Sequence, residues 1–395
     1  MRRTSPIRHR RILIVGGGIT GLTLARALTA DEHEVTVVEQ APAWAPLGAG
    51  ITLAGNAMAV LDRLGSGDAV RASGRRIAVG DVTDTTGRPL VSASLASRDD
   101  IPALADFWAL HRADLHRALE QAAADARLRL GTSIASLTDC GGAVEVAGND
   151  GFEQSVDLVI GADGIRSSVR ALLFGNVPAV RYAGYTCWRM VVPDRIGLDG
   201  SFEMWGRGQR IGLVPLIGER IYAFLVANAP PHGADPSGDQ RLPALRERFR
   251  AFAGKGGELL ATLDPGDPIL RHDIEELALP VWCRGRVALA GDAAHAMTPN
   301  LGQGAAQGIE DAHALRLALR QHSDDVAALV SYAKARAARV RAISARSRTI
   351  GRVGQWSGRI SCTARNALLR ATPSRAAVGN IERIIAPGLE LAAQG

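Results

Sequence analysis

The sequence predicts an α/β fold, in which a Rossmann-like domain is interrupted by an antiparallel β-sheet and followed by C-terminal helices. Three observations lead to this prediction. An apolar run near the N-terminus ends in a glycine-rich turn and continues with helical periodicity. Short β-rich runs separated by Gly, Pro and Asp turns fill the middle of the chain. From residue 325 onward, apolar residues recur near the 3.6-residue helical period.

The first element is a βαβ unit. Residues 11–15 (RILIV) form a short apolar strand, and Leu22, Leu24 and Leu28 mark the helix that follows. A second β-rich run over 34–38 stops at Glu39. The preceding basic residues and the Ala-Arg-Ala at 25–27 resemble a secretory signal, but cleavage there would remove the glycine turn. We therefore interpret the run as a buried strand and expect a cytoplasmic protein.

Two more buried strands are expected at 157–160 and 286–290, and each leads directly into a short motif of glycine and aspartate. Between them, the β-rich runs predict a sheet inserted into the nucleotide-binding fold. These runs cover 186–192, 210–215 and 221–226, with an earlier hairpin of 77–83 and 89–95. The predicted boundaries are 10–75, 100–178 and 274–330 for the Rossmann-like domain, 76–99 and 179–273 for the domain of the inserted sheet, and 331–395 for the helical segment.

In the C-terminal region, the periodic apolar residues predict one helical face packed on the body: Val326, Val330, Ala333, Ala337, Val340, Ile343, Ile350 and Val353. The formal net charge is +6, and no acidic residue lies between Asp325 and Glu382. The simplest interpretation is that the arginines of this stretch form a solvated helix face. They could also contact an anionic membrane surface or an acidic partner. No nucleic-acid recognition module is present, so nucleic-acid binding is not expected.

The composition excludes several other classes. Hydrophobic residues make up 47% of the 395, which is enough for a sizeable core. No apolar run reaches the roughly 18 residues that a membrane-spanning helix needs. The four cysteines, at positions 140, 187, 283 and 362, are too scattered for a disulfide framework or a zinc site. We expect a reducing compartment and no metal.

The glycine-rich turn after the first strand is the first motif that indicates a function. Gly16, Gly18 and Gly21 form a GxGxxG motif between a strand and a helix, and Glu39 ends the next strand. The glycines allow a tight turn, close approach of a pyrophosphate and close helix packing, while the amides of Ile19 and Thr20 face the phosphates. Glu39, followed by Gln40, can accept hydrogen bonds from ribose hydroxyls. The motif predicts dinucleotide binding.

Two later motifs identify the dinucleotide. One is Gly-Ala-Asp163-Gly-Ile-Arg at 161–166, and the other is Gly-Asp292-Ala-Ala-His at 291–295. Together with GxGxxG, this order and spacing resemble the single-component flavoprotein aromatic hydroxylases of the p-hydroxybenzoate hydroxylase type (class A), over about residues 10 to 350. The resemblance implies FAD as cofactor and NADPH or NADH as a transient co-substrate. It also implies an enzyme that uses O2, through a flavin C4a-hydroperoxide, to hydroxylate or epoxidise an aromatic or cyclic substrate.

The resemblance also implies roles for matching residues. Asp292 would bind the ribityl chain and Asp163 would lie near the pyrophosphate, while Ile134 would cover the adenine. Arg112 and the loop containing Gly50 and Thr52 would lie beside the flavin. The loop after Asp292 has a rationale of its own, because Pro299 fixes the chain and glycines allow close approach to a flat ring. A helix beginning near Gln303 would stabilise negative charge on the flavin; this part of the site comprises Gly302, Gln303, Gly304 and Ala305.

For the substrate, the stretch 205–222 resembles the subgroup that contains FAD-dependent urate hydroxylases and zeaxanthin epoxidases. Arg210 and Tyr222 match the positions that hold substrate in the urate enzymes. Asn300, however, replaces an aspartate of those enzymes, and its surroundings look more like the epoxidase branch. The expected ligand is therefore a small, lipophilic, cyclic molecule.

Two alternatives remain open from the sequence. One is a flavin oxidoreductase that never transfers oxygen to its substrate. The other is a non-catalytic FAD-fold binding protein, similar to the GDP-dissociation inhibitors of prenylated GTPases. The second would lack an intact flavin site.

Overall fold

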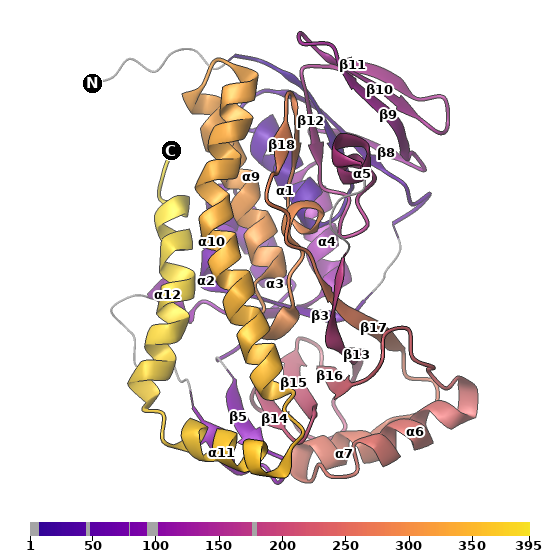
Figure 1. Ribbon diagram of the computed structural model, residues 1–395, viewed down its shortest axis with the longest axis vertical. Helices are drawn as coiled ribbons and strands as arrows, with labels where there is room; N and C mark the ends of the chain where they lie inside the picture. Colours follow the sequence, from indigo (N-terminus) through magenta and orange to yellow (C-terminus); the bar gives the residue numbers. More distant parts are fainter. Residues whose placement is uncertain (1–7, 45–47, 79, 93–101, 176–179) are drawn as a thin grey trace.

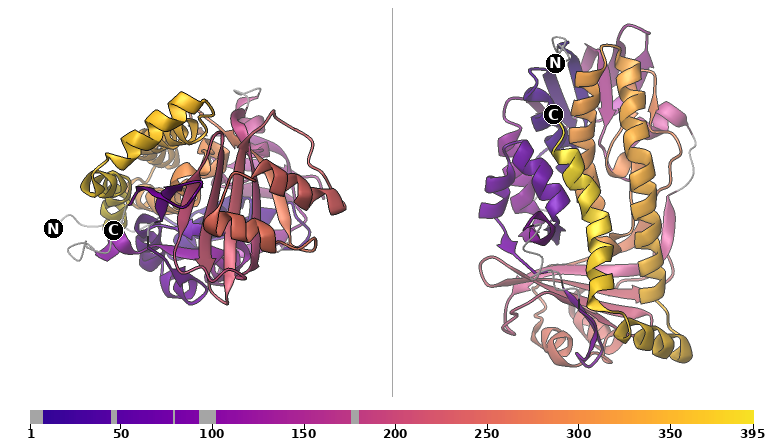
Figure 2. Two further views of the ribbon diagram at one scale, coloured as in Figure 1. Left: turned by 90° about the horizontal axis from the view of Figure 1, so that it is seen from below. Right: turned by 90° about the vertical axis from the view of Figure 1, so that its left-hand side faces the viewer.

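A computed structural model gives the arrangement of the chain and describes residues 8–44, 48–78, 80–92, 102–175 and 180–395. Two bodies lie one beyond the other along the long axis, and C-terminal helices run beside both (Figures 1 and 2). One body is built on a mostly parallel sheet and the other on a mostly antiparallel sheet. The predicted α/β fold with an inserted antiparallel sheet is confirmed.

The first body is built on a six-stranded sheet in which β1 lies between β12 and β2, all parallel. The last four residues of β1 and all of β12 are buried, which explains their unbroken apolar sequences. All four strands predicted for this domain are confirmed within one or two residues. In spatial order the strands are β18 (Cys283–Arg284), β19 (Val287–Leu289), β12 (Leu158–Gly161), β1 (Arg11–Val15), β2 (Glu34–Glu39) and β8 (Arg127–Leu130).

Helices cover this sheet and carry the loops of the site. Helix α9 packs against α1, α2 and α10, and α12 packs against α2 (Figure 1). The helical elements here are α1 (Ile19–Thr29), α2 (Gly55–Arg63), α3 (Gly67–Ala72), η1 (Pro102–Ala105), α4 (Arg112–Ala122), α5 (Ser168–Phe174), α8 (Asp292–His295), η3 (Pro299–Leu301) and α9 (Gly304–Gln321).

The second body is a seven-stranded sheet, which contains the three predicted central strands and the earlier hairpin. That hairpin is shorter than predicted, and residues 79 and 93–95 of it lie outside the described residues. The spatial order is β17 (Ile269–Glu276), β13 (Arg181–Pro193), β16 (Arg220–Asn228), β15 (Gln209–Leu216), β14 (Phe202–Trp205), β5 (Asp81–Asp84) and β6 (Pro89–Val91).

One face of this sheet packs against short helices at the far end of the molecule (Figure 1). Trp188, Met190 and Val192 of β13 belong to that core. Because side chains alternate along a strand, Cys187 and Arg189 face the other way, toward the nucleotide-binding body. The helical elements on the outer face are η2 (Gly238–Gln240), α6 (Arg241–Arg248) and α7 (Gly254–Thr262).

Two small sheets were not predicted from the sequence. Their strands are only two to six residues long, so periodicity says little about them. One contains β3 (Gly50–Leu53), β7 (Trp108–His111) and β4 (Arg75–Arg76), and the other contains β9 (Ile134–Asp139), β10 (Val144–Gly148) and β11 (Glu153–Val156).

The C-terminal region is helical as predicted, with α10 (Asp325–Gly354), α11 (Arg359–Arg370) and α12 (Ser374–Ala392). The predicted packed face of α10 is wrong at its start, because Val326 is 37% and Val330 is 52% exposed. The buried face instead mixes polar with apolar residues: Asp325, Ala328, Leu329, Tyr332, Arg336, Val340, Ile343, Ser347, Gly351 and Gly354. Within the described ranges, no helix is both long and apolar enough to cross a bilayer.

This orientation of α10 predicts opposite effects for two substitutions on one helix. Arg336→Met would leave buried carboxylates short of a partner, and we expect it to cost about 3–5 kcal/mol of unfolding free energy. Val330→Ser changes an exposed position and should cost no more than about 0.5 kcal/mol. Urea unfolding of the FAD-free variants measures both. Equal losses would contradict the packing described for α10.

Candidate active site

The glycine turn has two packed glycines and one that faces open space. Gly16 has φ +107°, and a Cβ there would lie 2.5 Å from the Ala162 carbonyl oxygen. A Cβ on Gly21 would lie 1.9 Å from the Gly16 carbonyl oxygen. At Gly18, by contrast, no atom of a described residue lies within 4 Å of that position. Gly18 is also the N-cap of α1 and provides no side-chain cap, so the first amides of the helix are free for a ligand.

Glu39 lies beside this turn. Its carboxylate accepts hydrogen bonds from the amides of Gly17 (2.8 Å) and Ala41 (2.9 Å), so the acid is fixed next to the glycines. Gln40 is exposed. Ile134 begins the nearby strand β9 but is only 5% exposed, so most of its surface already packs on the core.

Asp163 caps a helix in this structure. It accepts hydrogen bonds from the hydroxyls of Ser167 (2.5 Å) and Ser168 (3.0 Å) at the start of α5. Arg170 of the same helix is buried and donates to the Ala293 carbonyl in α8 (2.8 Å). The second motif is therefore bonded to the third.

The third motif also contacts the first. A Cβ on Gly291 would lie 2.4 Å from the Thr20 hydroxyl, and one on Gly308 would lie 2.1 Å from the same oxygen. Thr20 of α1 thus fills the space between the Asp292 loop and α9. Asp292 is the first residue of α8 and is exposed, without a hydrogen bond to any other described residue. The three motifs meet in one region rather than in separate cavities.

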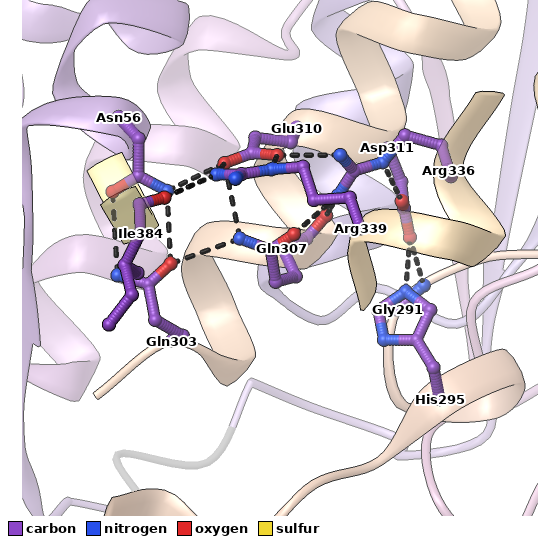
Figure 3. Close-up of polar contacts among 10 residues, drawn as sticks. All are labelled: Asn56, Gly291, His295, Gln303, Gln307, Glu310, Asp311, Arg336, Arg339 and Ile384. Atoms are coloured by element: carbon purple, nitrogen blue, oxygen red, sulfur yellow. Dashed lines mark hydrogen bonds and ion pairs between the residues drawn. The ribbon is translucent and has the colours of Figure 1, made fainter. Parts of the chain in front are cut away.

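Behind this region lies a buried charged network (Figure 3). Asp311 accepts hydrogen bonds from the Gly291 amide (2.9 Å) and from His295 Nε2 (2.6 Å), so His295 has a structural contact. Arg336 binds Asp311 (2.7 Å) and Glu310 (2.6 Å). Burial opposes ionisation of Asp311, but the charges of His295 and Arg336 outweigh it and lower its pKa to about 2.

The side chain of Gln303 belongs to this network. It is 3% exposed and accepts hydrogen bonds from Asn56 and Gln307, both at 3.0 Å. The Gln303 side chain is therefore engaged within the protein, and its backbone is the part of this residue left for a cofactor. Helix α9 begins at Gly304, as predicted, without a side-chain cap, and a Cβ on Gly304 would meet no described atom within 4 Å.

The predicted flavin loop lies against both bodies. Gly50 of β3 pairs with His111 of β7. The amide of the next residue, Arg112, donates a hydrogen bond to the Ala49 carbonyl (3.0 Å). A Cβ on Gly302, which has φ +62°, would approach the Thr52 hydroxyl at 3.1 Å. Gly50 also lies directly under Tyr222, since a Cβ there would lie 2.2 Å from that ring. Pro299 is exposed at the start of η3, close to this loop.

Arg210 does not fit the expected role of substrate anchor. It is 3% exposed, and each guanidinium nitrogen has a protein partner at 2.9 Å: Gln355, Glu203 and Asn300. The amide of Asn300 in turn donates to the Tyr185 hydroxyl (2.9 Å). Arg210 therefore joins the antiparallel sheet to the loop after Asp292, and a substrate would have to displace those bonds.

The residue that sequence reasoning missed is Arg189. It faces the nucleotide-binding body from β13, opposite Phe224 in the register, and its Nε is buried without a hydrogen-bond partner. No described acid pairs with it. The hydroxyl of Tyr222 is likewise without a described partner; burial raises the Tyr222 pKa to about 12, which keeps the phenol protonated. The alternation of β13 could have indicated Arg189, because its neighbours Trp188 and Met190 are apolar.

These features suit a long anionic dinucleotide with a flat ring. Three helix N-termini, those of α1, α8 and α9, lack side-chain caps. Free amides at helix N-termini favour phosphates and other negative charge. Gly18 and Gly304 leave open the space that a Cβ would fill. The residues present therefore fit FAD.

Comparison with known proteins agrees with this geometry. The model of the FAD binding domain family matches residues 9–347. The chain is 38% identical to Aurachin C monooxygenase/isomerase of Stigmatella aurantiaca, over 92% of this chain and 94% of that protein. It is 37% identical to 2-heptyl-3-hydroxy-4(1H)-quinolone synthase of Pseudomonas aeruginosa, over 97% and 100% respectively. Among solved structures, Klebsiella pneumoniae HpxO complexed with FAD and uric acid is 27% identical, covers 98% of this chain and 99% of its own, and has a TM-score of 0.88.

The glycine turn yields a matched pair of substitutions. Gly18→Ala meets no protein atom, so we expect a normal fold but at least a tenfold loss of FAD affinity, because the added methyl would occupy space near the phosphates. Gly21→Ala collides with a backbone oxygen and should lower the melting temperature of the FAD-free protein. Circular dichroism and flavin fluorescence titration separate the two effects. Unchanged FAD affinity in Gly18→Ala would contradict the assignment.

Proposed function

Since this chain belongs to the FAD binding domain family of flavoprotein monooxygenases, we propose that it hydroxylates the ring of a 4(1H)-quinolone that carries an alkyl chain. The chain is an FAD-dependent monooxygenase that uses NAD(P)H and O2 on a small cyclic molecule. Relatives that span nearly the whole chain are oxygenases, so the alternatives of a non-oxygenating reductase and a non-catalytic binding protein are set aside. The quinolone is the proposed part.

FAD, when bound, supplies the redox chemistry, and the chain holds it in place. We assign the amides of Gly18–Gly21 to the pyrophosphate, Glu39 to a ribose and Asp292 to the ribityl chain. Asp163 contributes through α5, whose start it caps. The uncapped start of α9 favours negative charge on the ring system. Arg112 and the Gly50–Thr52 strand border the same ring.

The wall opposite this ring is largely apolar. An apolar cluster joins Val214 of the antiparallel sheet with Ala109 of β7, and Val191, Tyr222 and Phe224 pack against it. Such a wall favours a flat, lipophilic ring over a highly polar one. It also excludes water, which protects a reactive oxidant from unproductive decay.

Arg189 supplies the polar contact in this wall. Its guanidinium pairs with no acid among the described residues, and its buried Nε has no hydrogen-bond partner there, so this N–H can bind a carbonyl or an oxyanion of the substrate. A 4(1H)-quinolone has a ring carbonyl conjugated to a ring nitrogen, which makes the carbon beside the carbonyl electron-rich. Arg189 bound to that carbonyl would orient this carbon toward the flavin. The unpaired Nε of Arg189, buried beside an apolar wall, is the observation that carries the proposal.

The decisive experiment is turnover of 2-heptyl-4(1H)-quinolone by the FAD-loaded enzyme with NADH or NADPH under ¹⁸O2. We expect the quinolone to accelerate NAD(P)H oxidation and to acquire one ¹⁸O atom, detected by mass spectrometry. Uric acid serves as the comparison substrate. Acceleration by uric acid but not by the quinolone would overturn the assignment, as would oxidation that yields only hydrogen peroxide.

Arg189→Met tests the anchor. Loss of a charge-assisted hydrogen bond should raise KM for the quinolone about ten- to a hundredfold, because such bonds contribute roughly 1.5–3 kcal/mol. Arg189→Lys should recover part of the loss. NAD(P)H oxidation without substrate should stay unchanged. Arg250→Met, at a 75% exposed arginine side chain on the outer side, is the control and should leave KM as it is. An unaltered KM in Arg189→Met would refute the role.

A further inference from the structure

Trp356, which follows α10, and helix α11 leave an apolar surface uncovered. Ile360 is 87% exposed, Leu368 is 72% exposed and Trp356, just before α11, is 41% exposed. Ile360, Ala364 and Leu368 follow one another at four-residue intervals, so they share one face of the helix. Scattered exposed apolar residues are ordinary, whereas an aligned group usually marks a binding surface.

The opposite face of α11 is fixed to the protein. Arg365 is 2% exposed, donates to the Gly206 carbonyl (2.9 Å) and lies over the Trp205 ring at 5.4 Å. Cys362 is buried beside it. Helix α11 therefore cannot roll over to hide Ile360 and Leu368 without giving up these contacts. The exposed stripe is a constant feature of the folded molecule.

The stripe lies at the end of the molecule that carries the antiparallel sheet (Figures 1 and 2). The amide of Gly208 donates to the Trp356 carbonyl (2.7 Å), and Arg207 donates to the Ser357 carbonyl (3.0 Å). Both belong to the turn between β14 and β15. Any surface that binds this end of the protein would therefore lie close to the seven-stranded antiparallel sheet.

The charge around the stripe is positive. Arg207, Arg352 and Arg359 are exposed around it, and no acidic residue occurs between Asp325 and Glu382. The arginine at position 370 is paired with Asp84. Apolar side chains bordered by arginines are the pattern of a helix that lies in the interface of an anionic bilayer. An acidic protein partner would pair with the arginines, but its charge would not account for the exposed apolar side chains of Ile360 and Leu368.

We propose that Trp356 and α11 form a docking surface for an anionic membrane, with the helix parallel to the bilayer plane. Ile360, Ala364 and Leu368 enter the apolar boundary, while Arg352 and Arg359 contact lipid phosphates. Docking would place the seven-stranded antiparallel sheet next to the membrane, in which lipophilic ring compounds accumulate. The proposal concerns binding alone and does not depend on which ring the enzyme oxidises.

Vesicle co-sedimentation of the FAD-loaded full chain tests it. We expect binding to vesicles of phosphatidylcholine mixed with phosphatidylglycerol, weaker binding in raised salt, and little binding to phosphatidylcholine alone. The double variant Ile360→Ser with Leu368→Ser should bind at least tenfold more weakly and retain its FAD content and melting temperature. Val281→Ser, at a 51% exposed apolar residue elsewhere, is the matched control and should bind as the parent does.

Two outcomes would overturn the proposal. One is a parent protein that sediments with neither kind of vesicle. The other is a double variant that binds as tightly as the parent, since the contact would then be purely electrostatic or located elsewhere. Turnover plays no part in either measurement, so a wrong substrate assignment would not affect the result.

Discussion

The rest of the structure depends on the buried ion network of Asp311, Glu310 and Arg336. Charges inside a protein persist only when they are paired and hydrogen-bonded, and here each acid has an arginine partner (Figure 3). The network lies on α9 and α10 and reaches the Gly291 amide through Asp311. It thereby ties the helices behind the site to the loop that presents Asp292.

A second polar connection joins the two bodies. Arg210 of the antiparallel sheet donates a hydrogen bond to Asn300 of η3. Asn300 in turn donates to the hydroxyl of Tyr185 in β13. The segment from Gly291 to Asn300 is therefore bonded both to the helices of the first body and to the antiparallel sheet of the second. This bonding also separates two arginines of the antiparallel sheet: all three guanidinium nitrogens of Arg210 have protein partners, whereas the buried Nε of Arg189 has none among the described residues.

The positive charge of the C-terminal region has two distinct uses. Arg336 and Arg365 are buried and bind acids or carbonyl oxygens within the protein. Arg352 and Arg359 are exposed around the apolar stripe of α11. A formal count of charges treats all four alike. The desolvated arginines organise the interior, whereas the solvated ones can act only on what approaches the surface.

The sequence by itself determined the fold class, the order of the main strands and the three glycine motifs. Those features are local: a buried parallel strand must be apolar throughout, and Gly16 and Gly21 have space for no side chain. The tertiary structure decided which face of α10 is buried, because paired charges at Arg336 replace the apolar residues that periodicity favours. It also decided that Arg210 is bonded at every guanidinium nitrogen and that Arg189 keeps an unpaired Nε among the described residues. Whether an arginine has a partner depends on residues far along the chain, which no local pattern records.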